Sequence, residues 1–219
     1  QAIMREIDGT LSRLGTDYLD LYIIHRFDYD TPIEETMEAL HDLVKAGKVR
    51  ALGASAMYGY QFYNMQLAAR DNGWTPFSAM ENHYNLLYRE DERELLPICK
   101  QMKVSLMPYS PLAAGHLARP QWKSESLRGT TDRVAMGKYD KTEAEDMQIV
   151  KRVAELAEKY NCKMSQIAIA WQWAKGILSP IIGATKTQSL DDSAGAFDIK
   201  LTAEDLAYLE EPYVPHEIV

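Results

Sequence analysis

Apolar positions along the 219-residue chain follow two spacings, one typical of helices and the other of buried strands. A helix is predicted over 1–14 by apolar residues three or four positions apart: Ile3, Ile7, Leu11 and Leu14. The next apolar run covers 19–25, is rich in branched and aromatic residues, lacks Gly and Pro, and ends at His25. These features predict a buried strand with an imidazole at its carboxyl end.

The same alternation of strands and helices continues to the end of the chain. Further strands are predicted at 49–53, 77–81, 104–109 and 179–183. Further helices are predicted between Thr31 and Gly47 and over 58–72, 91–101, 142–160, 164–175, 187–197 and 202–210. Thr31 and Thr142 each stand three residues before a Glu, a spacing that predicts a capping box at the start of a helix.

Strands that alternate with helices of this length indicate parallel strands joined by right-handed crossovers. The fold class expected is an α/β (β/α)8 barrel, formed as a single domain over 1–219. Five strands cannot close an eight-stranded barrel, so we expect the first three βα units, roughly 100 residues, to be missing. An open flavodoxin-like sheet is the alternative. Segment 113–141 shows no periodicity and is predicted to be a long irregular loop.

Composition and motifs narrow the chemistry. The net charge of -8 argues against a nucleic-acid or anionic-membrane surface, and no apolar stretch approaches the ~20 residues of a membrane span. Cys99 and Cys162 lack paired spacing, which is typical of reduced thiols in a cytoplasmic protein. The glycine fingerprints of Rossmann and P-loop proteins, the serine-hydrolase elbow and the zinc-ligand spacings are all lacking. No metal is expected.

Polar residues follow every predicted strand, and together they form an ordered set. This set consists of the motifs GTDYLDLYIIHR at 15–26, LGAS at 52–55, HYNLL at 83–87, YSPL at 109–112 and IGATK at 182–186. In this order and spacing they resemble the aldo-keto reductase superfamily, in particular its branch of enzymes like aryl-alcohol dehydrogenases. The resemblance extends over essentially the whole chain.

This resemblance implies a barrel that binds NADPH across its carboxyl face and passes hydride to the carbonyl carbon of a small aldehyde or ketone. His25 falls on the family's catalytic histidine, where a neutral imidazole would orient and polarise the carbonyl oxygen. Tyr109 falls on the aromatic residue that stacks on the nicotinamide. Ser55 and Glu81 fall on positions that contact the carboxamide, although the family commonly has Gln at the second and Asn in place of Ala56.

The other implied cofactor residues belong to two segments. Ser110, Leu112 and Gly115 match the loop that covers the pyrophosphate, where backbone N–H groups suit phosphate oxygens. Five more residues lie in or just before the predicted helix near 187–197, two of them before it and three within it: Thr185, Lys186, Ser189, Asp192 and Ser193. The first three match the site of the adenosine 2′-phosphate and favour NADP over NAD. Asp192 and Ser193 stand where the family generally has Glu and Asn against adenine.

The family's Asp, Tyr and Lys, which protonate the carbonyl oxygen, all lie upstream of residue 1 in this resemblance. We therefore expect the 219-residue chain alone to be inactive, because removal of a general acid costs about 10²–10⁴ in rate. Open barrel edges would favour self-association. Two alternatives remain open: a nucleotide-binding regulatory subunit of the same fold without enzymatic activity, and a different barrel enzyme that acts on a sugar phosphate.

Overall fold

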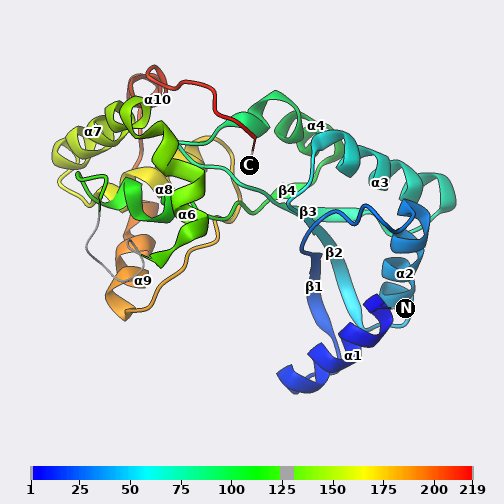
Figure 1. Cartoon of the computed structure of the whole chain (residues 1–219). Helices are drawn as coiled ribbons and strands as arrows, with labels where there is room; N and C mark the ends of the chain where they lie inside the picture. Colours follow the sequence, from blue (N-terminus) through cyan, green and yellow to red (C-terminus); the bar gives the residue numbers. More distant parts are fainter. Residues whose placement is uncertain (1, 124–130, 219) are drawn as a thin grey trace. The chain divides into compact units, whose positions relative to one another are not determined.

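The computed structural model describes residues 2–123 and 131–218 of the chain (Figure 1). It contains two compact units. The first comprises residues up to Asn82 together with Asp91–Met107, and the second comprises His83–Glu90 together with the chain from Pro108 onward.

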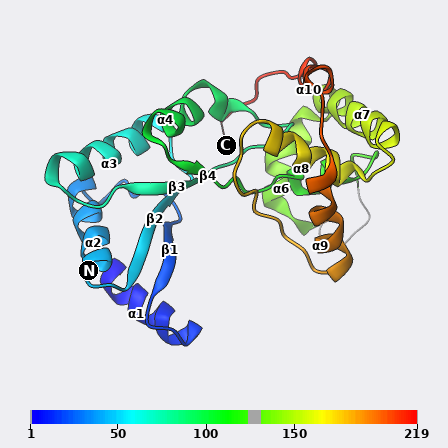
Figure 2. The same ribbon diagram turned by 180° about the vertical axis from the view of Figure 1, so that it is seen from behind.

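The first unit is a four-stranded parallel sheet with helices packed against it, in the strand order β1-β2-β3-β4. Its elements are α1 (Ala2–Leu14), β1 (Leu19–Ile24), α2 (Ile33–Lys45), β2 (Val49–Ser55), α3 (Gly59–Asn72), β3 (Phe77–Glu81), the 3-10 helix η1 (Glu90–Arg93), α4 (Leu95–Met102) and β4 (Ser105–Leu106). Seen from behind in Figure 2, α2 and α3 lie on the same side of β2, as they do in Figure 1. The prediction of parallel strands is therefore confirmed.

The core of this unit lies between the helices and the sheet. Its fully buried side chains include Ile7, Met37, Leu40, Leu52, Phe62 and Met80. The predicted stripe of α1 is only partly buried, since Ile7 and Leu11 are buried whereas Leu14 is 63% exposed. Gly15 ends α1 with φ +67°, a left-handed backbone conformation that glycine adopts without steric cost.

The second unit is helical. Its elements are the 3-10 helix η2 (Ala113–Ala118), α6 (Arg133–Tyr139), the 3-10 helix η3 (Asp140–Thr142), α7 (Glu143–Lys159), α8 (Met164–Ala174), α9 (Thr187–Ala194), the 3-10 helix η4 (Gly195–Asp198) and α10 (Ala203–Glu210). The central helix is α8, which packs against α7, α9, η2 and η4. Its buried Trp171 lies 5.1 Å from the ring of Tyr84, and Gln172 donates a hydrogen bond to the carbonyl oxygen of Tyr84.

Two strand predictions need correction. Segment 179–183 is not a strand, and it is joined to the end of the fourth predicted strand by a hydrogen bond from the Ile181 N–H to the Pro108 carbonyl oxygen at 2.9 Å. The predicted strand 104–109 is reduced to the two residues of β4. Pro180 and Pro108 have no N–H to donate, which limits the ladder that either segment can form. The described chain therefore has four strands instead of five.

Both predicted capping boxes are wrong, because each threonine hydroxyl is bonded elsewhere. Thr31 donates to Asp28 at 2.7 Å, and Pro32 is the residue that precedes α2. The Thr142 hydroxyl lies 2.7 Å from Asp146 Oδ2 and 3.0 Å from the Tyr139 carbonyl oxygen and donates its one proton to these acceptors, so the N-terminus of α7 has no side-chain cap. Segment 113–141 also departs from the expected irregular loop, since η2 and α6 lie within it; residues 124–130 lie outside the described chain.

Candidate active site

Three of the predicted site residues meet at the carboxyl edge of the parallel sheet. His25 directly follows β1, whose last residue, Ile24, pairs with Ala54 of β2. The next residue of β2, Ser55, pairs with Glu81 at the end of β3. The register therefore places His25, Ser55 and Glu81 at the same edge of adjacent strands, where parallel α/β proteins carry their chemistry.

The side chains at this edge differ in exposure. Ser55 is 2% exposed, and its hydroxyl donates a 2.8 Å hydrogen bond to the Glu81 carbonyl oxygen. Its donor is therefore used within the sheet, while the oxygen can still accept from a ligand. His25 is exposed and Glu81 is partly buried. Ala56, the residue after Ser55, has φ +45°, a conformation that a non-glycine residue rarely adopts and that often occurs at functional sites.

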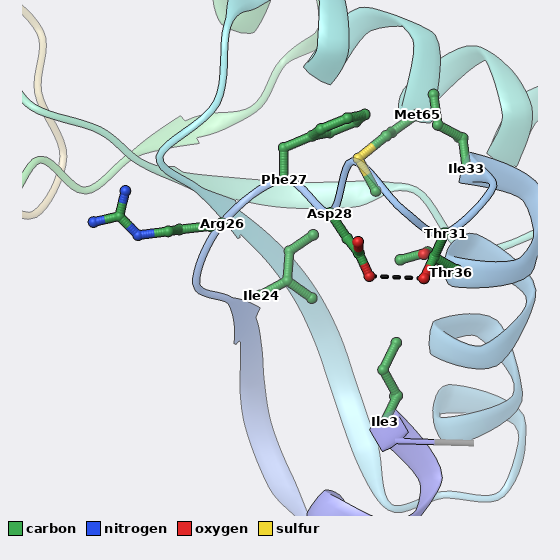
Figure 3. A pocket seen from close by; sticks show the side chains of 9 residues that line it. All are labelled: Ile3, Ile24, Arg26, Phe27, Asp28, Thr31, Ile33, Thr36 and Met65. Carbon is green, nitrogen blue, oxygen red and sulfur yellow. Dashed lines mark hydrogen bonds between the residues drawn. The ribbon is translucent and has the colours of Figure 1, made fainter. Parts of the chain in front are cut away.

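A pocket of about 170 Å³ lies beside the loop that follows β1 (Figure 3). Its lining is largely apolar and includes Ile24, Phe27 and Met65, and two further lining residues, Thr31 and Asp28, are joined by a hydrogen bond. None of the predicted site residues lines this pocket. It is therefore not the expected cofactor site.

In the second unit, Tyr109 belongs to a stack of three nearly parallel rings. His83 lies 5.1 Å from Tyr109 with 3° between the ring planes, and 4.2 Å from Tyr88 with 18° between them. His83 and Tyr109 also form an isolated parallel β-bridge, which fixes their backbones side by side. From α6, the Lys138 ammonium donates to the Tyr109 hydroxyl at 3.2 Å. Tyr109, the residue expected to stack on the nicotinamide, is therefore held in place by His83 and Lys138.

The buried imidazole of His83 is hydrogen-bonded within the ring cluster. Its Nε2 lies 2.7 Å from the Tyr139 hydroxyl, and that hydroxyl also accepts from the Asn85 amide at 3.1 Å. Burial, assisted by the positive charge of Lys138, lowers the pKa of His83 to about 3, so the imidazole is neutral. Burial raises the pKa of Tyr139, whose hydroxyl therefore keeps its proton. The other ring nitrogen of His83, Nδ1, is buried and has no hydrogen-bond partner among the described residues.

The loop after Tyr109 is held in a strained conformation. Ser110, Ala113 and Ala114 have φ of +55°, +47° and +54°, and Gly115 has φ +97°. The Asn85 amide fixes its start by donating to the Ser110 carbonyl oxygen at 2.9 Å. Such clusters of left-handed residues make concave surfaces of backbone N–H groups that bind anions.

The other end of this loop is held by Arg119. Its guanidinium donates to the carbonyl oxygens of Gly115 and Trp122 at 2.8 and 3.0 Å. Leu112, which precedes η2, is half-buried. Gly115 has φ +97°, which favours glycine, and a Cβ atom there would lie 2.7 Å from Arg119 Nη1, so the guanidinium would have to shift.

The residues expected to hold the adenosine end lie before and on α9. Thr185, Lys186 and Ser189 are exposed, and Lys186 occupies the N-cap position of α9 without a capping hydrogen bond from its side chain. Asp192 forms an ion pair with Lys163 at 2.6 Å, and that hydrogen bond lowers the pKa of its carboxyl group. Ser193 is buried and donates to the Ser189 carbonyl oxygen. The two side chains expected to contact adenine are therefore bonded within the protein.

Two residues that were not predicted belong to the Tyr109 cluster. Lys138 and Tyr139 lie in the segment predicted to be irregular, and no motif marks them. His83 was visible in the sequence as part of HYNLL, but its role beside Tyr109 follows only from the structure. Within the described residues, no group of three or more His, Cys, Asp or Glu side chains could hold a metal ion. Over the same residues, no helix has the length and apolar character needed to cross a bilayer.

The fold and this edge of polar residues define an α/β protein with parallel strands whose candidate chemistry lies at the strand ends. The sequence model of the aldo/keto reductase family matches residues 1–213, and the chain belongs to this family. This assignment confirms the resemblance and decides against a flavodoxin-like sheet.

Named relatives agree with the assignment. The chain is 46% identical over 218 residues to an aldo-keto reductase of Fusarium vanettenii and 44% identical over 217 residues to versiconal hemiacetal acetate reductase of Aspergillus parasiticus. Each match covers 99% of this chain, which spans 58% and 63% of the two relatives. Among solved structures, a thermostable aldo-keto reductase in complex with the inhibitor epalrestat matches 96% of this chain and 65% of its own, with a TM-score of 0.77 and 27% identity.

Proposed function

We propose that this chain forms the cofactor-binding part of an NADPH-dependent reductase of aldehydes and ketones, with aromatic or small aliphatic carbonyl substrates. The observation that carries the proposal is the strand register that brings His25, Ser55 and Glu81 to one edge of the sheet. Carbonyl reduction, usually with NADP, is the reaction typical of the family to which the chain belongs.

The residues present fit a dinucleotide phosphate. The left-handed loop from Ser110 to Gly115 would place backbone N–H groups near the pyrophosphate, with Leu112 among them. The N–H groups of Ala113 and Gly115 already donate to the carbonyl oxygens of Ser110 and Leu112, so these two would have to leave their present acceptors to bind phosphate. Thr185, Lys186 and Ser189 combine hydroxyls, an ammonium and a helix N-terminus, which favour the 2′-phosphate of NADP(H) over the bare hydroxyl of NAD(H).

The nicotinamide end would be held by the residues at the strand ends. Tyr109 would stack on the ring, while Ser55 and Glu81 would accept hydrogen bonds from the carboxamide. The expected contacts of Asp192 and Ser193 with adenine would require both side chains to leave their present partners. When bound, the cofactor supplies the hydride.

His25 is the residue of this chain that would act on the substrate. An exposed imidazole at the edge of the sheet can donate a hydrogen bond to a carbonyl oxygen, which orients the carbonyl and makes its carbon more electrophilic. No tyrosine here matches the family's acid by motif, so we expect the 219-residue chain alone to bind NADPH without turnover. We place the protein in the cytoplasm, because Cys99 and Cys162 are both free thiols.

Fluorescence titration of the chain with NADPH and NADH tests the proposal. We expect NADPH to quench tryptophan fluorescence with higher affinity than NADH. Lys186→Ala should weaken NADPH binding by about tenfold and leave NADH binding unchanged, since the lost ion pair is with the 2′-phosphate. Equal affinity for both nucleotides, or tighter binding of a sugar phosphate, would contradict the proposal. Absence of aldehyde turnover in a longer form that carries the family's tyrosine would favour the regulatory alternative.

A further inference from the structure

The Lys138 ammonium is fixed next to the ring of Tyr109. It lies 4.8 Å from the ring centroid and donates to the hydroxyl at 3.2 Å. Its helix, α6, is anchored at both ends, because Asp132 accepts from the Ala135 N–H at 3.0 Å and the buried Tyr139 is bonded to His83. Lys138 therefore belongs to the ring cluster and is not a freely moving surface lysine.

The charge of Lys138 acts inside this cluster. The His83 ring stacks on Tyr109, and its pKa is lowered mainly by burial. The positive charge of Lys138 is the second cause of this lowering. A positive charge that disfavours a second cation at His83 must also disfavour a cation stacked on the same tyrosine, since the repulsion depends on distance and dielectric and not on chemical identity.

The distance to a stacked ligand is bounded by geometry. Stacked rings place their centroids roughly 5 Å apart. Because the His83 ring covers one face of Tyr109, a ligand ring would stack on the other face, with its centre within about 10 Å of the Lys138 ammonium. The oxidised nicotinamide ring carries a positive charge and the reduced ring is neutral, whereas the phosphates of the two forms are the same. The positive charge of Lys138 therefore weakens binding of the oxidised form more than binding of the reduced form.

We propose that Lys138 is a specificity-determining residue that makes this site favour NADPH over NADP+. The inference rests on the proposed function, since it requires the nicotinamide to stack on Tyr109. Two unit charges about 10 Å apart, at an effective dielectric constant of roughly 20 to 40, change a ratio of dissociation constants by about four- to sixteenfold. Screening by salt favours the lower value, about fourfold. A site with this preference binds the hydride donor tightly and releases the oxidised product.

The experiment compares the dissociation constants of NADPH and NADP+ for the wild-type chain and three variants. Lys138→Gln removes the charge, and Lys138→Arg keeps it. Lys141→Gln is the matched control, because Lys141 lies three residues further on, has a side chain that is 78% exposed, and makes a 3.8 Å ion pair with Glu217. Fluorescence quenching measures both constants without catalysis, and circular dichroism verifies that each variant is folded.

We expect Lys138→Gln to lower the ratio of the NADP+ to the NADPH dissociation constant by about fourfold, and Lys138→Arg and Lys141→Gln to leave it within twofold. The effect should shrink at high salt. A ratio unchanged in Lys138→Gln, with both constants shifted by the same factor, would overturn this inference and leave the proposed function intact. Failure of the wild-type chain to bind either nucleotide would overturn the proposed function and this inference with it.

Discussion

The segment after α10 is fastened to α7 through a buried ion pair. His216 Nε2 lies 3.1 Å from both carboxylate oxygens of Asp146, and the two side chains are only 5% and 1% exposed. Thr142 also donates to Asp146, while Glu90 accepts from the backbone N–H of His216 and from the Tyr213 hydroxyl. These bonds join the end of the chain to two distant parts of the second unit.

Substitution His216→Gln should lower the free energy of unfolding by about 3–5 kcal/mol. The magnitude follows from the burial of Asp146, since removal of His216 leaves a buried carboxylate without its cationic partner, close to the Thr142 hydroxyl. The hydrogen bond to Asp146 raises the pKa of His216 above its ordinary 6.5. Its stabilising contribution is therefore complete below about pH 6.5 and is lost as the pH rises through the raised pKa.

Urea unfolding at pH 5.5 and 8.5, followed by tryptophan fluorescence, measures both effects. We expect the cost of His216→Gln to be larger at the lower pH, and the double variant with Asp146→Asn to cost less than the sum of the two single variants. Lys141→Gln is the control, because its pair with Glu217 is exposed and should be worth less than about 0.5 kcal/mol. A cost of His216→Gln below 0.5 kcal/mol, or one that grows with pH, would refute the reasoning.

Three further substitutions or titrations probe other parts of the structure. Gly115→Ala should weaken NADPH binding several-fold and lower the free energy of unfolding by about 1–3 kcal/mol, because φ is +97° and the new Cβ would lie 2.7 Å from Arg119. Unchanged titration and melting curves would argue against this loop conformation. Gly53→Ala should cost about 1–3 kcal/mol in chemical denaturation, since its Cβ would lie 2.9 Å from Ile23; wild-type stability would contradict the packing of β1 on β2. Burial alone would raise the pKa of Asp205, but hydrogen bonds from neighbouring side chains lower it to about 2. Its contribution to stability should therefore be present above its ordinary 3.8 and be lost as the pH falls towards 2, and an NMR titration midpoint at 3.8 would disprove this.

The sequence by itself determined most of the helices and three strands. The helix predicted over 142–160 is α7 (Glu143–Lys159), and the strand at 77–81 is β3 with the same bounds. These elements are readable because a helix or a buried strand repeats its apolar residues at a fixed local spacing. The family could be identified from the sequence for a related reason, since its motifs keep their order and spacing along the chain.

Tertiary structure alone decided which groups become partners. Segment 179–183 has the composition of a strand but lacks a ladder, because a strand exists only with a neighbour that can exchange hydrogen bonds with it. Thr31 has the spacing of a cap, yet its hydroxyl is bonded to Asp28. Lys138 carries no local signal, and its contact with Tyr109 joins residues 29 positions apart. Such contacts depend on distances between segments, which the local spacing of residues along a chain does not encode.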